Sequence, residues 1–260
     1  MLKIYRNLIQ YKDLLLILTW REISVRYRQT TIGIAWAIIQ PLSLMLVFSF
    51  IFTYLMPTKV SGYPKMIFFY AALVPWTFFS TAINYAIPCL VNQYNLITKI
   101  YFPREILPIS QIIVAFVDFL LASILFVFFM FFYNISLTWY VLWFFPLFIQ
   151  LILFTVAMSL MLSSLNVFYR DVNVASGFVM RLWFFMTPIF YSIDALSIKI
   201  KLLLFLNPLT FIIENMRRCL IEGRGVIVWQ FLIVSVILLI YFFASIVYFK
   251  KIERKFADVI

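Results

Sequence analysis

The sequence predicts an all-α polytopic membrane protein with six transmembrane helices. Hydrophobic residues make up 65% of its 260 positions, and its mean hydropathy is +1.05, whereas about half of a soluble domain is apolar. Charged residues make up only 12%, against roughly 25% in soluble domains, and they cluster between long apolar runs. Such a chain cannot bury its apolar surface in one core surrounded by water, so we expect the bilayer to cover it.

A membrane-spanning helix needs about 20 mostly apolar residues. Six runs have this length, and together they define a transmembrane domain at 33–253. These runs lie at 33–55, 67–90, 107–132, 139–165, 174–193 and 228–249.

The basic residues predict the orientation, because Lys and Arg are retained on the cytoplasmic side of a membrane. With the N-terminus inside, thirteen of them fall in cytoplasmic segments and seven in external ones. We therefore place the N-terminal segment 1–32 and the tail 254–260 at the cytoplasmic side of the inner membrane, which requires an even number of spans. The net charge of +11 is better explained by this membrane face than by binding to nucleic acid. No cleavable signal peptide is expected.

Residues 14–31 predict an amphipathic helix rather than a span. At 100° per residue its narrow apolar stripe comprises Leu16, Trp20, Ile23 and Tyr27. Its charged side comprises Arg21, Glu22, Arg26 and Arg28. We expect this helix to lie in the cytoplasmic membrane interface with its basic side toward water and lipid phosphates. Simple anchoring and a role in gating are both open.

Motifs for nucleotide or metal chemistry are missing from the sequence. None of the five glycines begins a phosphate loop, and there is no G-x-G-x-x-G. The chain has no His, and Cys89 and Cys219 are far apart in apolar surroundings, so we expect no metal, disulfide or bound cofactor. A pump built on this chain would need ATP hydrolysed by another subunit.

The cytoplasmic loop at 92–108 is the most informative loop. Pro103 at a first helical position, with Glu105 in the first turn, predicts that a helix starts there. The preceding residues with an apolar edge are Leu96, Ile97, Ile100 and Tyr101. Uncovered apolar surface in such a loop suggests a docking knob for a partner, and packing against the membrane surface is the alternative.

Residues 197–221 are apolar but broken at Asn207-Pro208. A seventh span here would put the basic C-terminus outside, so we expect two short re-entrant helices at the external face, forming a gate or channel mouth. On the second of these, Glu214, Arg217 and Arg218 are helical neighbours. They either satisfy one another at the outer interface or meet a polar or anionic substrate.

Two charges lie inside expected spans, where charges are costly. Asp118 in the third span and Arg181 in the fifth differ in depth by roughly 6 Å, so they can pair if their helices touch. A structural ion pair, or an Arg181 that reaches the interface, competes with a functional role.

Aromatic residues make up 20% of the chain. Most of them suit lipid contact, and an excess along a pathway would suit sugar rings.

Five segments in order resemble the membrane subunit of type-2 ABC exporters, specifically the polysaccharide and O-antigen (lipopolysaccharide) export permeases, with teichoic acid permeases close. They are WREISVRYRQTTIGIAWAIIQPL (20–42), LITKIYFPREILP (96–108), LNVFYRDV (165–172), FFMTPIFY (184–191) and NPLTFIIENMRRCLIEG (207–223). Each motif alone is modestly specific, whereas five in order are strongly specific, and the match runs along nearly the whole chain.

The resemblance implies a homodimer of six-span permeases paired with two separate ATPase subunits. These subunits would bind ATP and Mg and drive a lipid-linked polysaccharide outward. By the same resemblance the amphipathic helix is an interface helix, and 92–106 is the coupling loop that seats in the ATPase through Leu96, Ile97, Thr98, Lys99, Ile100 and Tyr101. The external gate at 197–221 would include Asn207, Pro208, Glu214, Arg217 and Arg218.

Two other functions are open from sequence. One is a type-2 exporter of teichoic acid, capsule polymer, small lipids or drugs. The other is a polytopic membrane enzyme acting on lipid-linked sugars. Such an enzyme would need acidic or His residues clustered near one face, whereas the ten acidic residues here are scattered singly.

Overall fold

The computed structural model describes residues 9–28, 30–55 and 62–256, so the predicted cytoplasmic segments 1–8 and 257–260 lie outside the described residues. Within the described ranges the chain is helical and contains no strand. The α-helices are α2 (Lys12–Tyr27), α3 (Trp36–Phe50), α4 (Lys65–Asn92), α5 (Tyr94–Lys99), α6 (Ile106–Phe132), α7 (Phe144–Phe168), α8 (Asp171–Met186), α9 (Ile198–Phe205), α10 (Pro208–Arg217) and α11 (Val228–Ile252).

Five helical stretches of the described chain are long and apolar enough to cross a membrane. They correspond closely to five of the six predicted runs. Short 3-10 or π turns extend most of them beyond the α-helix itself. The five stretches are Gly33–Leu55, Lys65–Asn92, Ile106–Phe132, Trp139–Phe168 and Val228–Lys255.

The sixth predicted run, at 174–193, is not one continuous helix. Helix α8 has 16 residues and ends at Met186, so it is about 24 Å long, less than the roughly 30 Å of a hydrocarbon core. It ends because Thr187 precedes Pro188, and a residue before proline is pushed out of the helical region; Thr187 has φ −96° and ψ 138°. The following residues 187–192 are irregular. The prediction of a continuous helix is therefore wrong for the end of this run, residues 187–193.

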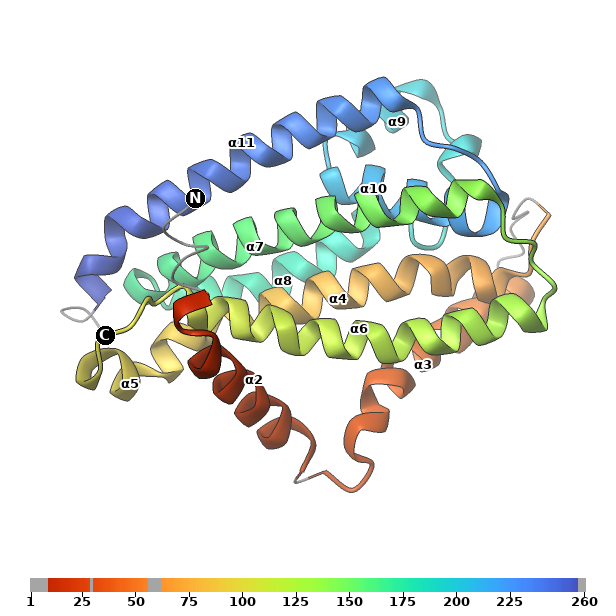
Figure 1. The fold of residues 1–260 in the computed structure, drawn as a ribbon. Helices are drawn as coiled ribbons and strands as arrows, with labels where there is room; N and C mark the ends of the chain where they lie inside the picture. Colours follow the sequence, from red (N-terminus) through yellow and green to blue (C-terminus); the bar gives the residue numbers. More distant parts are fainter. Residues whose placement is uncertain (1–8, 29, 56–61, 257–260) are drawn as a thin grey trace.

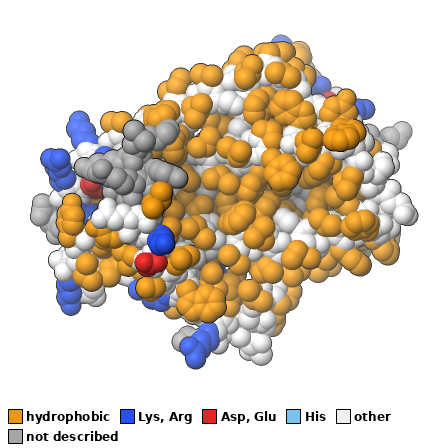
Figure 2. Space-filling view, viewed as in Figure 1, with side chains coloured by type: hydrophobic (Ala, Val, Ile, Leu, Met, Phe, Trp, Pro, Cys, Tyr) orange, Lys and Arg blue, Asp and Glu red, His pale blue; other side chains and the backbone are white. Residues whose placement is uncertain are grey.

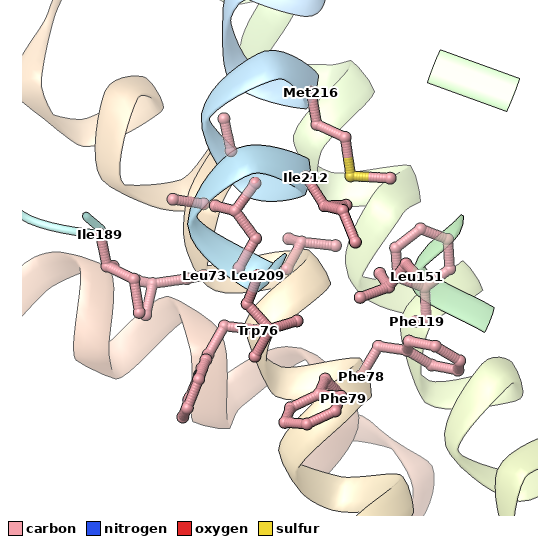
Figure 3. Close-up of a cluster of buried hydrophobic side chains, with 14 of the residues drawn as sticks. Leu73, Trp76, Phe78, Phe79, Phe119, Leu151, Ile189, Leu209, Ile212 and Met216 are labelled. Carbon is pink, nitrogen blue, oxygen red and sulfur yellow. The ribbon is translucent and has the colours of Figure 1, made fainter. Parts of the chain in front are cut away.

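Helix α4 forms the centre of the bundle. In its most apolar window 78% of the residues are buried inside the protein, against 17–33% for the other four candidate spans. It packs against α3, α6, α7, α8 and α10. Figure 3 shows how Trp76, Phe78 and Phe79 of this helix meet side chains from several neighbours. The neighbours labelled there are Phe119 of α6, Leu151 of α7, Ile189, and Leu209, Ile212 and Met216 of α10.

Both described ends of the chain lie at the same end of the bundle as α5 (Figure 1), here called the α5 end. A separate apolar cluster joins them, because Leu18 of α2, Ile97 of α5, and Phe249 and Phe256 near the C-terminus pack together. Helices α9 and α10 lie toward the opposite end. Figure 2 shows a hydrophobic surface over the middle of the molecule, with many of the Lys and Arg side chains gathered at the α5 end. This distribution is typical of a membrane protein.

Candidate functional site

Helix α2 and helix α3 form a V on one side of the bundle, beside α6 (Figure 1). The inner side of α2 buries Leu18 and Thr19 and packs against α6. On its outer side Leu16 is 63% exposed and Trp20 is 71% exposed. A helix therefore exists where the amphipathic helix was predicted, and much of its exposed surface is apolar.

The sequence predicted that the charged side of α2 lies toward water and lipid phosphates. In the structure, part of this side faces the helix bundle instead. Arg21 and Arg28 are exposed, but Arg26 is half-buried and turns toward α6. Glu22 accepts hydrogen bonds from Arg21 at 2.8 Å and from the Gln93 side chain at 3.3 Å. Two charged residues of α2, Glu22 and Arg26, therefore bind side chains of the helix bundle.

Asp118 is the residue on α6 that receives Arg26. The Arg26 guanidinium donates to the Asp118 carboxylate at 2.6 Å, and the Tyr27 hydroxyl donates to the other carboxylate oxygen. Arg26 also lies 3.8 Å from the centroid of the Tyr85 ring, within the range of a cation–π contact. Burial, and next the hydrogen bond to Asp118, raise the pKa of Tyr27 far above its ordinary value. The phenol therefore stays protonated and keeps its hydrogen bond.

The predicted pair between Asp118 and Arg181 is wrong. Asp118 is on α6 and Arg181 is on α8, and helix α4 packs against both of these helices. The Arg181 side chain is exposed rather than directed to Asp118. The amphipathic helix folds back along α6 and brings Arg26, 92 residues earlier in the chain, to the carboxylate instead.

A polar cavity of about 360 Å³ lies inside the V. Among the described residues, Arg26 and Asp118 are the only charged ones in its wall, and they neutralise each other. The wall also carries uncharged polar side chains and aromatic rings from α3, α4 and α6. These include Gln40, Thr77, Thr81, Asn84, Trp36, Tyr85 and Phe119.

We expect Asp118→Leu to lower the free energy of unfolding by about 1.5–3 kcal/mol, because it removes hydrogen bonds to a charged group and leaves Arg26 unpaired. Thermal or chemical unfolding of the purified protein measures this. The double variant Arg26→Leu/Asp118→Leu should recover part of the loss, and Arg21→Leu, which breaks only an exposed pair, should change the value by less than about 0.5 kcal/mol. Equal stability of Asp118→Leu and the wild type would contradict the anchor.

The predicted coupling segment contains the short helix α5. Thr98 and Lys99 are exposed, Ile100 is 58% exposed and Tyr101 is 94% exposed. Leu96 is partly buried and Ile97 is 4% exposed. The apolar edge predicted from sequence is therefore narrower than expected, because Ile97 packs into the cluster at the α5 end.

Ion pairs fix the surroundings of α5. Glu105 is fully buried and accepts a hydrogen bond from Lys250 of α11 at 2.7 Å. Arg104 donates to the backbone carbonyl of Glu253, and Lys250 also pairs with the Glu253 carboxylate at 3.0 Å. Helix α6 begins at Ile106 with Glu105 as its N-cap residue, so the prediction that Pro103 occupies the first helical position is wrong by three residues. The bonds from Arg104 and Glu105 to Glu253 and Lys250 therefore attach the start of α6 to the C-terminal end of α11.

Helices α9 and α10 meet at the predicted break. Asn207 caps α10, since its side-chain oxygen accepts from the Leu209 N–H at 3.1 Å, and Pro208 occupies the first turn. The Asn207 amide also donates to the Thr187 hydroxyl at 3.3 Å. The break after α8 and the break before α10 are therefore held to each other.

Glu214 and Arg217 on α10, and Arg218 directly after it, pair with one another, as one of the two alternatives predicted. Glu214 and Arg217 are buried in the protein rather than at the outer surface, which corrects the predicted location of these two residues. Arg217 is fully buried, pairs with the buried Glu214, and donates to the Pro188 carbonyl at 3.0 Å. Its guanidinium lies 3.7 Å from the centroid of the Phe68 ring. Arg218 is more exposed and links Glu214 to Asp194, at 3.2 and 2.7 Å. These bonds join α10 and the turn after it to Pro188 in the irregular stretch and to Asp194 in the 3-10 turn that follows.

Sequence analysis missed the polar cavity, because its residues come from four helices. One signal was available: Thr77, Thr81 and Asn84 recur at i, i+4 and i+7 in an otherwise apolar span, which places them on one face of the helix. The partner of Glu105 was also missed, because Lys250 is 145 residues away.

The fold defines a polytopic helical membrane protein whose internal charges mostly bind one another. Within the described ranges no group of three or more acidic, His or Cys side chains could hold a metal ion. A family model described as ABC-2 type transporter matches residues 13–221, and the chain belongs to this family. It is similar to an O-antigen export system permease protein RfbA of Myxococcus xanthus, with 30% identity over 86% of each chain. A protein of the same name from Klebsiella pneumoniae is 29% identical over 100% of this chain and 99% of its own length.

Proposed function

We propose that this chain is the membrane-spanning permease subunit of an ABC transporter that exports a lipid-linked polysaccharide of the O-antigen type. The observation that carries the proposal is similarity to relatives named for O-antigen export, over 86% of this chain for one and 100% for another. The family match supports the role of transport subunit. The chain itself would have no enzymatic activity, and a separate subunit would bind ATP and Mg.

The proposed topology has six crossings, with both chain ends in the cytoplasm at the inner membrane. Both described ends lie at the α5 end, and this arrangement needs an even number of crossings. Helix α8, continued by the irregular residues 187–193, would be the sixth. Irregular backbone is tolerated at membrane depth where it is buried in protein, and Ile189, Phe190 and Ile193 are buried.

The proposed partners are a second copy of this chain and two ATPase subunits. The ATPase would dock at the α5 end, where Ile100 and Tyr101 expose apolar surface. Helices α9 and α10 would serve as the external gate, because a hydrogen bond between Asn207 and Thr187 joins the break before α10 to the break after α8.

A strain that lacks this gene tests the function. We expect lipid-linked polymer to accumulate inside the cell and surface polymer to disappear, and a plasmid copy of the gene to restore it. Normal surface polymer together with increased sensitivity to small lipophilic drugs would favour an exporter of small molecules instead. Loss of teichoic acid or capsule alone would redirect the proposal to those polymers.

A further inference from the structure

The polar cavity in the V holds amide and hydroxyl groups that the protein leaves unsatisfied. In the part of the chain that the structure describes, the side chains of Gln40, Thr81 and Asn84 make no hydrogen bond to another protein group. Gln40 and Asn84 are exposed to the cavity. Gln40 belongs to the candidate span Gly33–Leu55 and Asn84 to Lys65–Asn92.

These groups lie too deep to be ordinary interfacial residues. Asn84 is eight residues from the end of α4 at Asn92, which corresponds to about 12 Å along the helix. An amide without a partner in hydrocarbon costs roughly 2–7 kcal/mol. The cavity therefore needs a hydrophilic occupant with both donors and acceptors.

The charge of the wall selects a neutral occupant. Arg26 is bound to Asp118 at 2.6 Å and to the face of Tyr85, so its charge is compensated within the wall. A phosphate or diphosphate placed here would lie beside the Asp118 carboxylate, which repels it. A neutral ligand meets no such penalty.

The aromatic residues of the wall define the chemistry further. Trp36 is 45% exposed and Tyr85 is 46% exposed, and both rings border the cavity. A ligand with hydroxyl groups around its edge and an apolar C–H face matches a wall that carries amides and hydroxyls together with aromatic rings. The volume of about 360 Å³ falls within the range of about 300–1,000 Å³ that is usual for small-molecule sites.

We infer that this cavity is a binding subsite for uncharged sugar residues, and that it holds part of the cargo beside helix α2 before transfer. This inference rests on the proposed function, since the sugar is taken to belong to the exported polymer. Thr77 contributes an acceptor, because its hydroxyl proton is already donated to the Val74 carbonyl at 2.9 Å. Gln40, Thr81 and Asn84 supply the remaining donors and acceptors.

The first test uses substitutions that keep side-chain size. Gln40→Leu/Asn84→Leu removes two polar contacts worth about 0.5–1.5 kcal/mol each, so we expect the rate of polymer export to fall about tenfold or more. Thr81→Val should give a smaller loss, and Ser80→Ala, which deletes the neighbouring hydroxyl of α4 outside the cavity wall, should export like the wild type. Each variant is compared at equal amounts of protein in the membrane fraction.

The second test is a cross-link in cells. A benzophenone amino acid replaces Trp36, or Ile124, which is 67% exposed on α6 outside the cavity. After irradiation we expect a protein adduct that a lectin specific for the polymer detects at position 36 and not at 124. Wild-type export by Gln40→Leu/Asn84→Leu, or equal adducts at both positions, would overturn the sugar subsite. Surface polymer that persists in the deletion strain would instead overturn the proposed function.

Discussion

Replacing Arg217 by methionine should lower the free energy of unfolding by about 3–5 kcal/mol, which is the usual cost of removing one partner of a buried ion pair. The variant leaves the buried Glu214 carboxylate with Arg218 as its remaining ion-pair partner. It also removes the hydrogen bond to the Pro188 carbonyl and the contact with the Phe68 ring. Thermal unfolding of the purified protein in lipid nanodiscs measures the effect.

The companion variants separate the lost charge pair from lost packing. Glu214→Leu/Arg217→Met removes both buried charges. It should be more stable than Arg217→Met alone, because the single variant keeps the buried Glu214 carboxylate with only the contact to Arg218 at 3.2 Å. Arg224→Met removes the contacts that a 68% exposed side chain makes to Asp194 and Glu222, and it should change stability by less than about 0.5 kcal/mol. If Arg217→Met unfolds like the wild type, Arg217 does not hold α10 to the segment after α8.

The same pair should govern local opening of the proposed gate. Arg217 is bonded to Pro188 and Asn207 to Thr187, so both ends of α10 are attached to the irregular segment. We therefore expect amide hydrogen exchange at Ile189, Phe190 and Leu209 to become faster in Arg217→Met, while exchange in α7 stays unchanged. This pattern distinguishes local opening from global unfolding.

The parts of the fold that local chemistry determines could be predicted from sequence. Long apolar runs located five candidate spans, and the Asn-Pro pair at 207 located the start of α10, because a capping side chain and a proline both act within one helical turn. The run at 174–193 was misjudged because it is mostly apolar, so its composition does not show where the helix ends. The signal that ended the helix was one dipeptide, Thr187-Pro188.

The parts that depend on contacts between distant segments could not be predicted. Helical periodicity separated the two faces of α2, but it could not say that Arg26 would meet Asp118 on α6 rather than water. Depth along a span made Arg181 a reasonable partner for Asp118, whereas the partner was decided by which helices touch. The polar cavity has the same origin, since residues from α2, α3, α4 and α6 must first assemble.

The α5 end gives the second large expected effect. Ile100→Ser/Tyr101→Ser removes the two most exposed apolar side chains of the predicted coupling segment. Burying such a side chain against a partner contributes about 1.5–3 kcal/mol, so we expect the affinity for the ATPase subunit to fall at least about a hundredfold. Binding of the purified ATPase to the permease in nanodiscs measures this, and polymer export should be lost in cells.

The structure also supplies the controls that separate docking from folding. Ile97→Ser acts on a buried side chain, so its first effect should be a lower free energy of unfolding, in contrast to the surface variant, which should unfold like the wild type. Trp139 lies in the connection between α6 and α7, and its side chain is 87% exposed. This connection is at the end of the bundle away from α5 (Figure 1), so Trp139→Ser should leave ATPase binding unchanged. If Ile100→Ser/Tyr101→Ser still binds the ATPase as tightly as the wild type, the docking surface lies elsewhere at the α5 end. The cavity of about 450 Å³ beside Tyr101, Arg104 and Arg254 is then the next surface to change.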